Sequence, residues 1–88
     1  MGASPQRSLN TKLIGGNIAE ANEQLARLLH TILTGKLNEA ELRVGLRHAY
    51  HHLNVAWNIR RVRTSEYADL TQEQFEEWGK CPCDIDEL

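Results

Sequence analysis

The 88-residue sequence predicts an all-α protein: a long antiparallel helical hairpin followed by a short third helix. Two observations favour this fold. Apolar residues recur every three or four positions over two long segments, and each segment begins with a residue type that caps helices. No segment shows the alternation of apolar and polar residues that is typical of half-buried strands.

The first helix is expected to begin after Asn17 and to end before Gly35. Asn17 and Glu20 have the spacing of a capping box, in which two side chains satisfy free backbone N–H groups at a helix start. Gly15-Gly16 lets the chain turn into the helix, so residues 1–16 are predicted to form a flexible N-terminal segment. The apolar positions of this helix are Ile18, Ala21, Leu25, Leu28, Leu29, Ile32 and Leu33.

The second helix is expected to begin after Asn38, with Glu41 at the third helical position. No proline interrupts the segment before Arg63, so a helix of about 24 residues, or about 36 Å, is predicted. The turn between the two helices is too short for anything but an antiparallel arrangement.

The third predicted helix is short. Thr71 and Gln74 form another capping box, and Gly79 is suited to end the helix. The predicted organisation is therefore a flexible segment over residues 1–16, a helical domain over 17–79 and an acidic C-terminal tail over 80–88.

The second helix carries two apolar faces. One is expected to pack against the first helix and contains Leu42, Leu46, Ala49, Tyr50, Leu53, Ala56 and Trp57. The other has the spacing of a packing seam and is predicted as a dimer interface; its members are Val44, His48, His51, Val55, Ile59 and Val62. Either a second copy covers this stripe, giving a four-helix dimer, or the C-terminal segment covers it with Tyr67, Leu70, Phe75 and Trp78.

Histidines and cysteines raise the question of a metal site. His48 and His52 are four residues apart on one helix, a spacing that can present two imidazoles to one ion. Cys81 and Cys83 could add thiolates, although Cys-Pro-Cys is not the usual two-residue zinc spacing. The competing interpretation is that the histidines are hydrogen-bonded packing residues, and no cofactor is predicted.

The charge is uneven along the chain. Residues 43–63 contain five arginines and no acid, whereas residues 64–88 contain eight acids and one lysine. The arginines do not share one helix face and no nucleic-acid-binding motif is present, so nucleic acid is not expected as the main partner.

These features predict an interaction protein rather than an enzyme. No nucleophile–base pair and no phosphate-binding glycine loop is recognisable, and no apolar run is long enough to span a bilayer. The expected function is a small helical protein–protein interaction or adaptor protein, acting as a cytoplasmic homodimer with a further protein partner left open. The alternative is a metal-responsive or nucleic-acid-binding regulator that uses the second helix.

Overall fold

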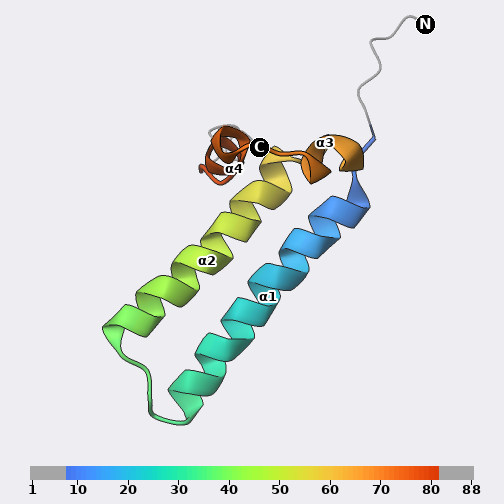
Figure 1. The fold of residues 1–88 in the computed structure, drawn as a ribbon. Helices are drawn as coiled ribbons and strands as arrows, with labels where there is room; N and C mark the ends of the chain where they lie inside the picture. The colour runs from blue at the N-terminus through green and yellow to red at the C-terminus, as the bar shows by residue number, and fades with distance from the viewer. Residues whose placement is uncertain (1–7, 82–88) are drawn as a thin grey trace, which may run out of the picture.

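The computed structural model describes residues 8–81. Its helices are α1 (Thr11–Leu33), α2 (Glu39–Asn58), α3 (Thr64–Ala68) and α4 (Gln72–Trp78). Figure 1 shows α1 and α2 side by side in opposite directions, with α3 and α4 near the end of α2. The described residues include no strand, which confirms the prediction of an all-α fold with two long helices packed together.

The start of α1 is fixed by Asn10. Its side-chain oxygen accepts a hydrogen bond from the backbone N–H of Leu13 (3.2 Å), which is the interaction of an N-cap. Its backbone N–H donates to the Arg60 carbonyl (2.7 Å), and its side-chain amide donates to the Val62 carbonyl (2.9 Å). Asn10 therefore joins the beginning of α1 to the chain that follows α2.

The predicted start of the first helix at Asn17 is wrong. Helix α1 begins seven residues earlier, after Asn10, and contains Gly15-Gly16 in its first turns. Each glycine costs a helix about 1 kcal/mol relative to alanine, and the bonds of Asn10 to the end of α2 offset this cost. Residues 11–16 are thus helical, while residues 1–7 of the predicted flexible segment lie outside the described part of the chain.

The other helix starts follow the sequence closely. The Asn38 side chain accepts a hydrogen bond from the Glu41 N–H (2.8 Å) at the start of α2. Thr71 and Gln74 make both bonds of the predicted capping box at the start of α4. Gly35 has a φ of 72°, the left-handed conformation expected after the first helix.

The end of α2 differs from the prediction. The helix ends at Asn58 rather than at Arg63, and the short helix α3, which the sequence analysis did not predict, follows after a turn. The turn is closed by bonds from the Ile59 N–H to the Val55 carbonyl and from the Val62 N–H to the Ile59 carbonyl.

Small residues line the contact between α1 and α2. Ala21, Ala49 and Ala56 are 1%, 3% and 8% exposed. Gly45 is also buried, and a Cβ atom at this position would lie 2.6–2.8 Å from the side chain of Leu28. The two helices therefore approach closely, and most of the large apolar side chains near the contact point away from it.

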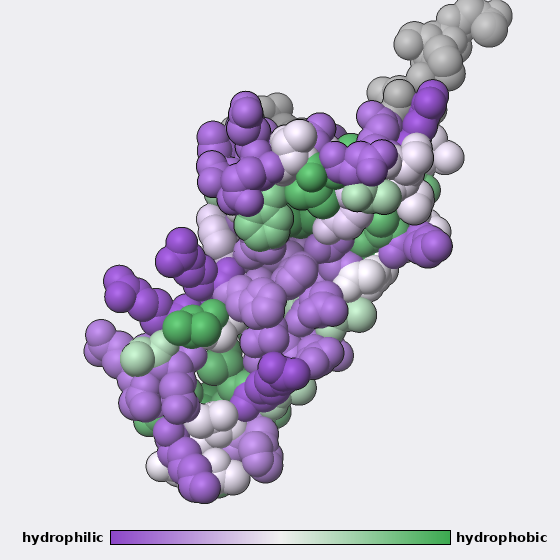
Figure 2. All heavy atoms as spheres, in the orientation of Figure 1, coloured by the Kyte–Doolittle hydropathy of each residue, from purple (hydrophilic) through white to green (hydrophobic). Residues whose placement is uncertain are grey.

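Helix α4 and the residue that follows it pack against the other side of α2. The side-chain amide of Asn58 donates to the Trp78 carbonyl (2.8 Å), and that of Asn54 donates to the Gly79 carbonyl (3.1 Å). The ring of Phe75 lies 4.6 Å from that of His51, centroid to centroid. Figure 2 shows hydrophobic atoms gathered where these helices meet the end of α2. The C-terminal segment is thus held by both apolar and polar contacts.

A membrane-spanning segment is not found in the structure. None of the helices within residues 8–81 combines the length and the apolar character that crossing a bilayer requires.

Candidate functional site

A broad apolar face lies open on the α1–α2 pair. Its members are between 44% and 57% exposed: Ile18, Leu25, Leu29 and Ile32 on α1, and Leu46, Tyr50 and Leu53 on α2. The spacings are 7, 4 and 3 residues on α1 and 4 and 3 residues on α2. These are heptad spacings, which are typical of helix faces that pack against further helices. We call these seven residues the apolar face.

The prediction that most of this face packs in the contact between the two long helices is wrong, because its members are about half exposed. Of the α1 side chains expected in the contact, Leu28 is buried at 9% exposure, whereas Leu29 is 57% exposed. On α2, Leu53 is 48% exposed. The physical reason is that alanine and glycine residues beside the large side chains allow a closer approach, which turns the large side chains outward.

Two apolar grooves run along this face. The first is lined by Leu25, Leu46, Arg47, Ala49, Tyr50 and Leu53. The second continues from Leu53 and is lined by Leu9, Ile14, Ile18, Ala56, Trp57 and Arg60. The guanidinium of Arg60 lies 4.0 Å from the centre of the Trp57 ring, and both residues line the second groove.

The predicted dimer-interface stripe has a different environment. Val55 and Ile59 are 3% and 0% exposed and are therefore buried within the chain. Val62 and His51 are partly buried. The exposed members of the stripe are Val44 and His48. Helix α4 contacts the stripe at His51, whose ring lies beside that of Phe75. This contact is the one expected if the C-terminal segment, rather than a second copy, covers this part of the stripe.

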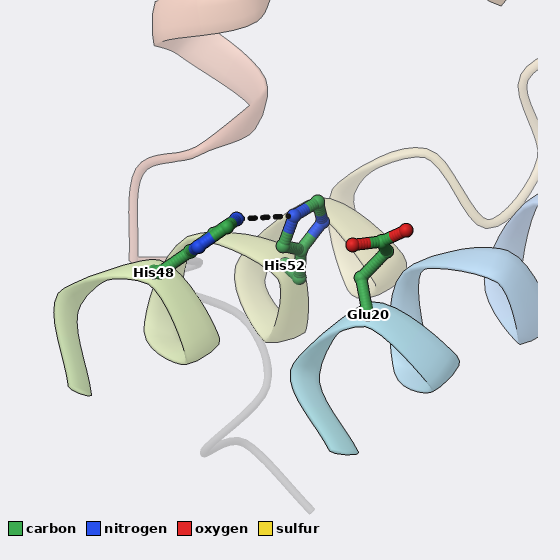
Figure 3. Close-up of side chains that lie close together, drawn as sticks. All are labelled: Glu20, His48 and His52. Carbon is green, nitrogen blue, oxygen red and sulfur yellow. Dashed lines mark hydrogen bonds between the residues drawn. The ribbon is translucent and has the colours of Figure 1, made fainter. Parts of the chain in front are cut away.

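A histidine cluster lies between the two long helices (Figure 3). The Nε2 atoms of His48 and His52 on α2 are 3.1 Å apart. Glu20 reaches the pair from α1, and one ligand atom from each of the three residues lies within 4.8 Å of the others. Glu20 and His48 are exposed and His52 is partly buried, so the cluster is open to solvent.

A buried asparagine orients His52. Asn17 is 5% exposed, and its side-chain amide donates to the Leu13 carbonyl (2.9 Å). Its oxygen therefore faces His52, whose Nδ1–H donates to it across 2.9 Å. With Nδ1 protonated, the neutral ring has its lone pair on Nε2, the atom that faces His48.

The predicted metal ligands are only partly brought together. His48 and His52 are adjacent, but Cys81 is exposed and contacts Tyr50, where a hydrogen bond to the thiol raises the pKa of Tyr50. Cys83 lies outside the described residues. The sequence pattern of Asn17 and Glu20 predicted a helix start. Their positions beside His52 and His48 could not be predicted, because a local pattern does not show which residues of α1 face α2.

Two histidine pKa values are lowered. Burial and the nearby His48 lower the pKa of His51. Burial, followed by the charges of His48 and His51, lowers the pKa of His52, and Glu20 opposes this shift. The neutral forms are therefore favoured in the folded chain.

We expect acid to destabilise the fold through these histidines. Because their folded pKa values lie below the unfolded value of about 6.5, the unfolded chain binds more protons and the free energy of unfolding falls as pH drops below about 6.5. Urea unfolding at pH 7.5 and 5.5 measures the difference. A double variant, His51→Gln with His52→Gln, should reduce it, whereas exposed His30→Gln should not. Equal or greater stability of the wild type at pH 5.5 would contradict the expectation.

Comparison of the chain with protein-family models, with curated proteins and with solved structures finds no match. The function of the chain must therefore be argued from its own geometry.

Proposed function

We propose that this chain is a protein–protein interaction module that associates with a second copy of itself through the apolar face. The observation that carries this proposal is the exposure of seven large apolar side chains at heptad spacing on two adjacent helices. Soluble monomers seldom leave a continuous apolar surface of this kind open to water.

A second copy suits the face because of its shape. Two helices about 30 Å long and about 9 Å apart present a nearly flat surface of roughly 550 Å². Two such faces would bury about 1,100 Å² in total, which approaches the size of stable interfaces. The product would be a four-helix arrangement with isologous contacts, in which each copy offers the same heptad rows.

The small hydrophobic core of the single chain is a second reason to propose self-association. Within residues 8–81, the buried apolar residues are Ala21, Leu28, Ala49, Val55, Ala56 and Ile59. Three of these six are alanines, so few large side chains are removed from water by folding alone. Association would bury the leucines and isoleucines of the apolar face, each worth about 1.5–3 kcal/mol when fully transferred from water.

We expect Leu53→Glu to prevent self-association. Leu53 lies where the two grooves meet and is 48% exposed in one chain. A glutamate is therefore tolerated in the single chain but would place an unpaired carboxylate inside the interface. The apparent dissociation constant, measured by sedimentation equilibrium, should rise at least about tenfold, which corresponds to about 1.4 kcal/mol.

The matched control is Val44→Glu. Val44 is 66% exposed and lies two residues before Leu46, which places it about 160° away around α2. This variant should keep the mass of the wild type. If Val44→Glu dissociates the protein and Leu53→Glu does not, the copies meet through the other stripe. Circular dichroism of both variants verifies that the helices are retained.

A further inference from the structure

We propose that Glu20, His48 and His52 form a binding site for one divalent transition-metal ion, with zinc as the best fit. The site is independent of the proposed self-association. Glu20 follows Ile18 by two residues, and His48 follows Leu46 by two, so these two ligands lie about 160° around their helices from those members of the apolar face, while His52 lies about 100° from Leu53.

The spacing of the two imidazoles fits one ion. Two nitrogen ligands at about 2.1 Å from a tetrahedral zinc ion lie about 3.4 Å apart. The Nε2 atoms of His48 and His52 are 3.1 Å apart. In the absence of an ion, one of these nitrogens donates a hydrogen bond to the other; an ion would replace that proton and use both lone pairs.

The orientation of His52 supplies an independent argument. Metal-binding histidines usually donate their second ring N–H to an oxygen of the protein, which fixes the tautomer and the ring plane. The Nδ1–H of His52 makes this bond to Asn17, whose own position is fixed by its bond to the Leu13 carbonyl. Asn17 is 5% exposed, so a buried polar side chain holds the His52 ring with its free Nε2 atom facing His48.

Glu20 completes the set from the other helix. Its carboxylate lies within 4.8 Å of both histidine ligand atoms. Because the side chain is exposed and has three rotatable bonds, it can move the remaining distance of about 1.5 Å to reach tetrahedral geometry. Two imidazoles and one carboxylate leave a fourth position for water, and imidazole favours zinc, copper or nickel over magnesium or calcium.

Groups from three helices surround the cluster. His52 faces Glu20 from α1 and His48 and His51 from its own helix, while α4 places Phe75 against His51. Burial and the neighbouring histidines lower the pKa of His52, and Glu20 opposes this shift. An ion bound to α1 and α2 together would link the two helices.

Calorimetric titration of the full chain with zinc chloride tests the site. We expect one ion per chain, and cobalt(II) should give the visible absorption of a tetrahedral complex. Glu20→Gln and His48→Gln should each weaken zinc binding at least tenfold; both residues are exposed, so both variants should fold. The matched controls, Glu23→Gln and His30→Gln, change exposed residues of the same types on α1 outside the cluster and should bind as the wild type does.

A further pair of substitutions separates this site from a thiolate site. Cys81→Ser combined with Cys83→Ser should leave zinc binding unchanged. If that double variant loses the ion, or if Glu20→Gln and His48→Gln bind zinc as tightly as their controls, the proposal is overturned. Failure of the wild type to bind zinc also overturns it and leaves the self-association proposal unaffected.

Discussion

Replacing Ile59 with alanine is expected to lower the free energy of unfolding by about 2–5 kcal/mol, the range for removing a large buried aliphatic side chain. Ile59 is 0% exposed and is the largest fully buried side chain in the described part of the molecule. It lies at the end of α2, where the turn toward α3 begins. A domain of this size has a total stability of roughly 4–13 kcal/mol, so the loss should be evident in urea unfolding.

The control for this substitution is Val44→Ala, made at the same protein concentration. Val44 is 66% exposed, so its truncation should change the free energy of unfolding by no more than about 0.5 kcal/mol. A loss below about 0.5 kcal/mol for Ile59→Ala would show that Ile59 is not buried in solution.

The second large effect is expected for Gly45→Val. The first side-chain carbon would lie 2.6–2.8 Å from three atoms of the Leu28 side chain. Leu28 is only 9% exposed, so it has little room to move and the helices must separate. Overpacking of this kind costs about 1–3 kcal/mol, and occasionally more. We expect a loss of about 3 kcal/mol because valine adds three carbon atoms at the closest approach of α1 and α2.

The matched control is Gly16→Val, the same change at another glycine within a helix. A Cβ atom at Gly16 meets nothing within 4 Å, so this variant should gain a few tenths of a kcal/mol from helix propensity. If Gly45→Val unfolds at the same urea concentration as Gly16→Val, the close contact between the two long helices is not present in solution.

Local signals in the sequence predicted much of the fold. Asn38 and Thr71 mark helix starts: Thr71 and Gln74 make both bonds of the predicted capping box, and Asn38 makes the side-chain bond of an N-cap. Asn17 carries the same pattern but lies inside α1. The true cap, Asn10, gains additional bonds to the chain beyond α2, and such tertiary bonds leave no trace in a local pattern.

The direction in which the apolar faces point could not be predicted from periodicity. Leu53 and Ala56 both lie on the face of α2 expected to meet α1, but only Ala56 is buried at 8% exposure. Two helices approach most closely where their smallest residues meet. A prediction from hydrophobic periodicity instead favours the large apolar residues, such as leucine, as the buried ones. The large residues beside the contact are then left for another partner.

Only the two histidines of the candidate metal site could be predicted from the sequence. The spacing of His48 and His52 on one helix is visible in the sequence, whereas Glu20 joins them only when α1 and α2 are aligned. Cys81, the other predicted ligand, contacts Tyr50 and not the two histidines. Whether Glu20 or Cys81 lies beside His48 and His52 depends on the tertiary arrangement, which the sequence pattern does not show.

The central claim is that the apolar face is an interface between two copies. Sedimentation equilibrium of the unmodified chain at pH 7.5, over a range of concentrations, tests it most directly. Self-association predicts a species of twice the 10.0 kDa mass of one chain, with the single chain appearing only on dilution. A constant mass of 10.0 kDa at every concentration would contradict the claim.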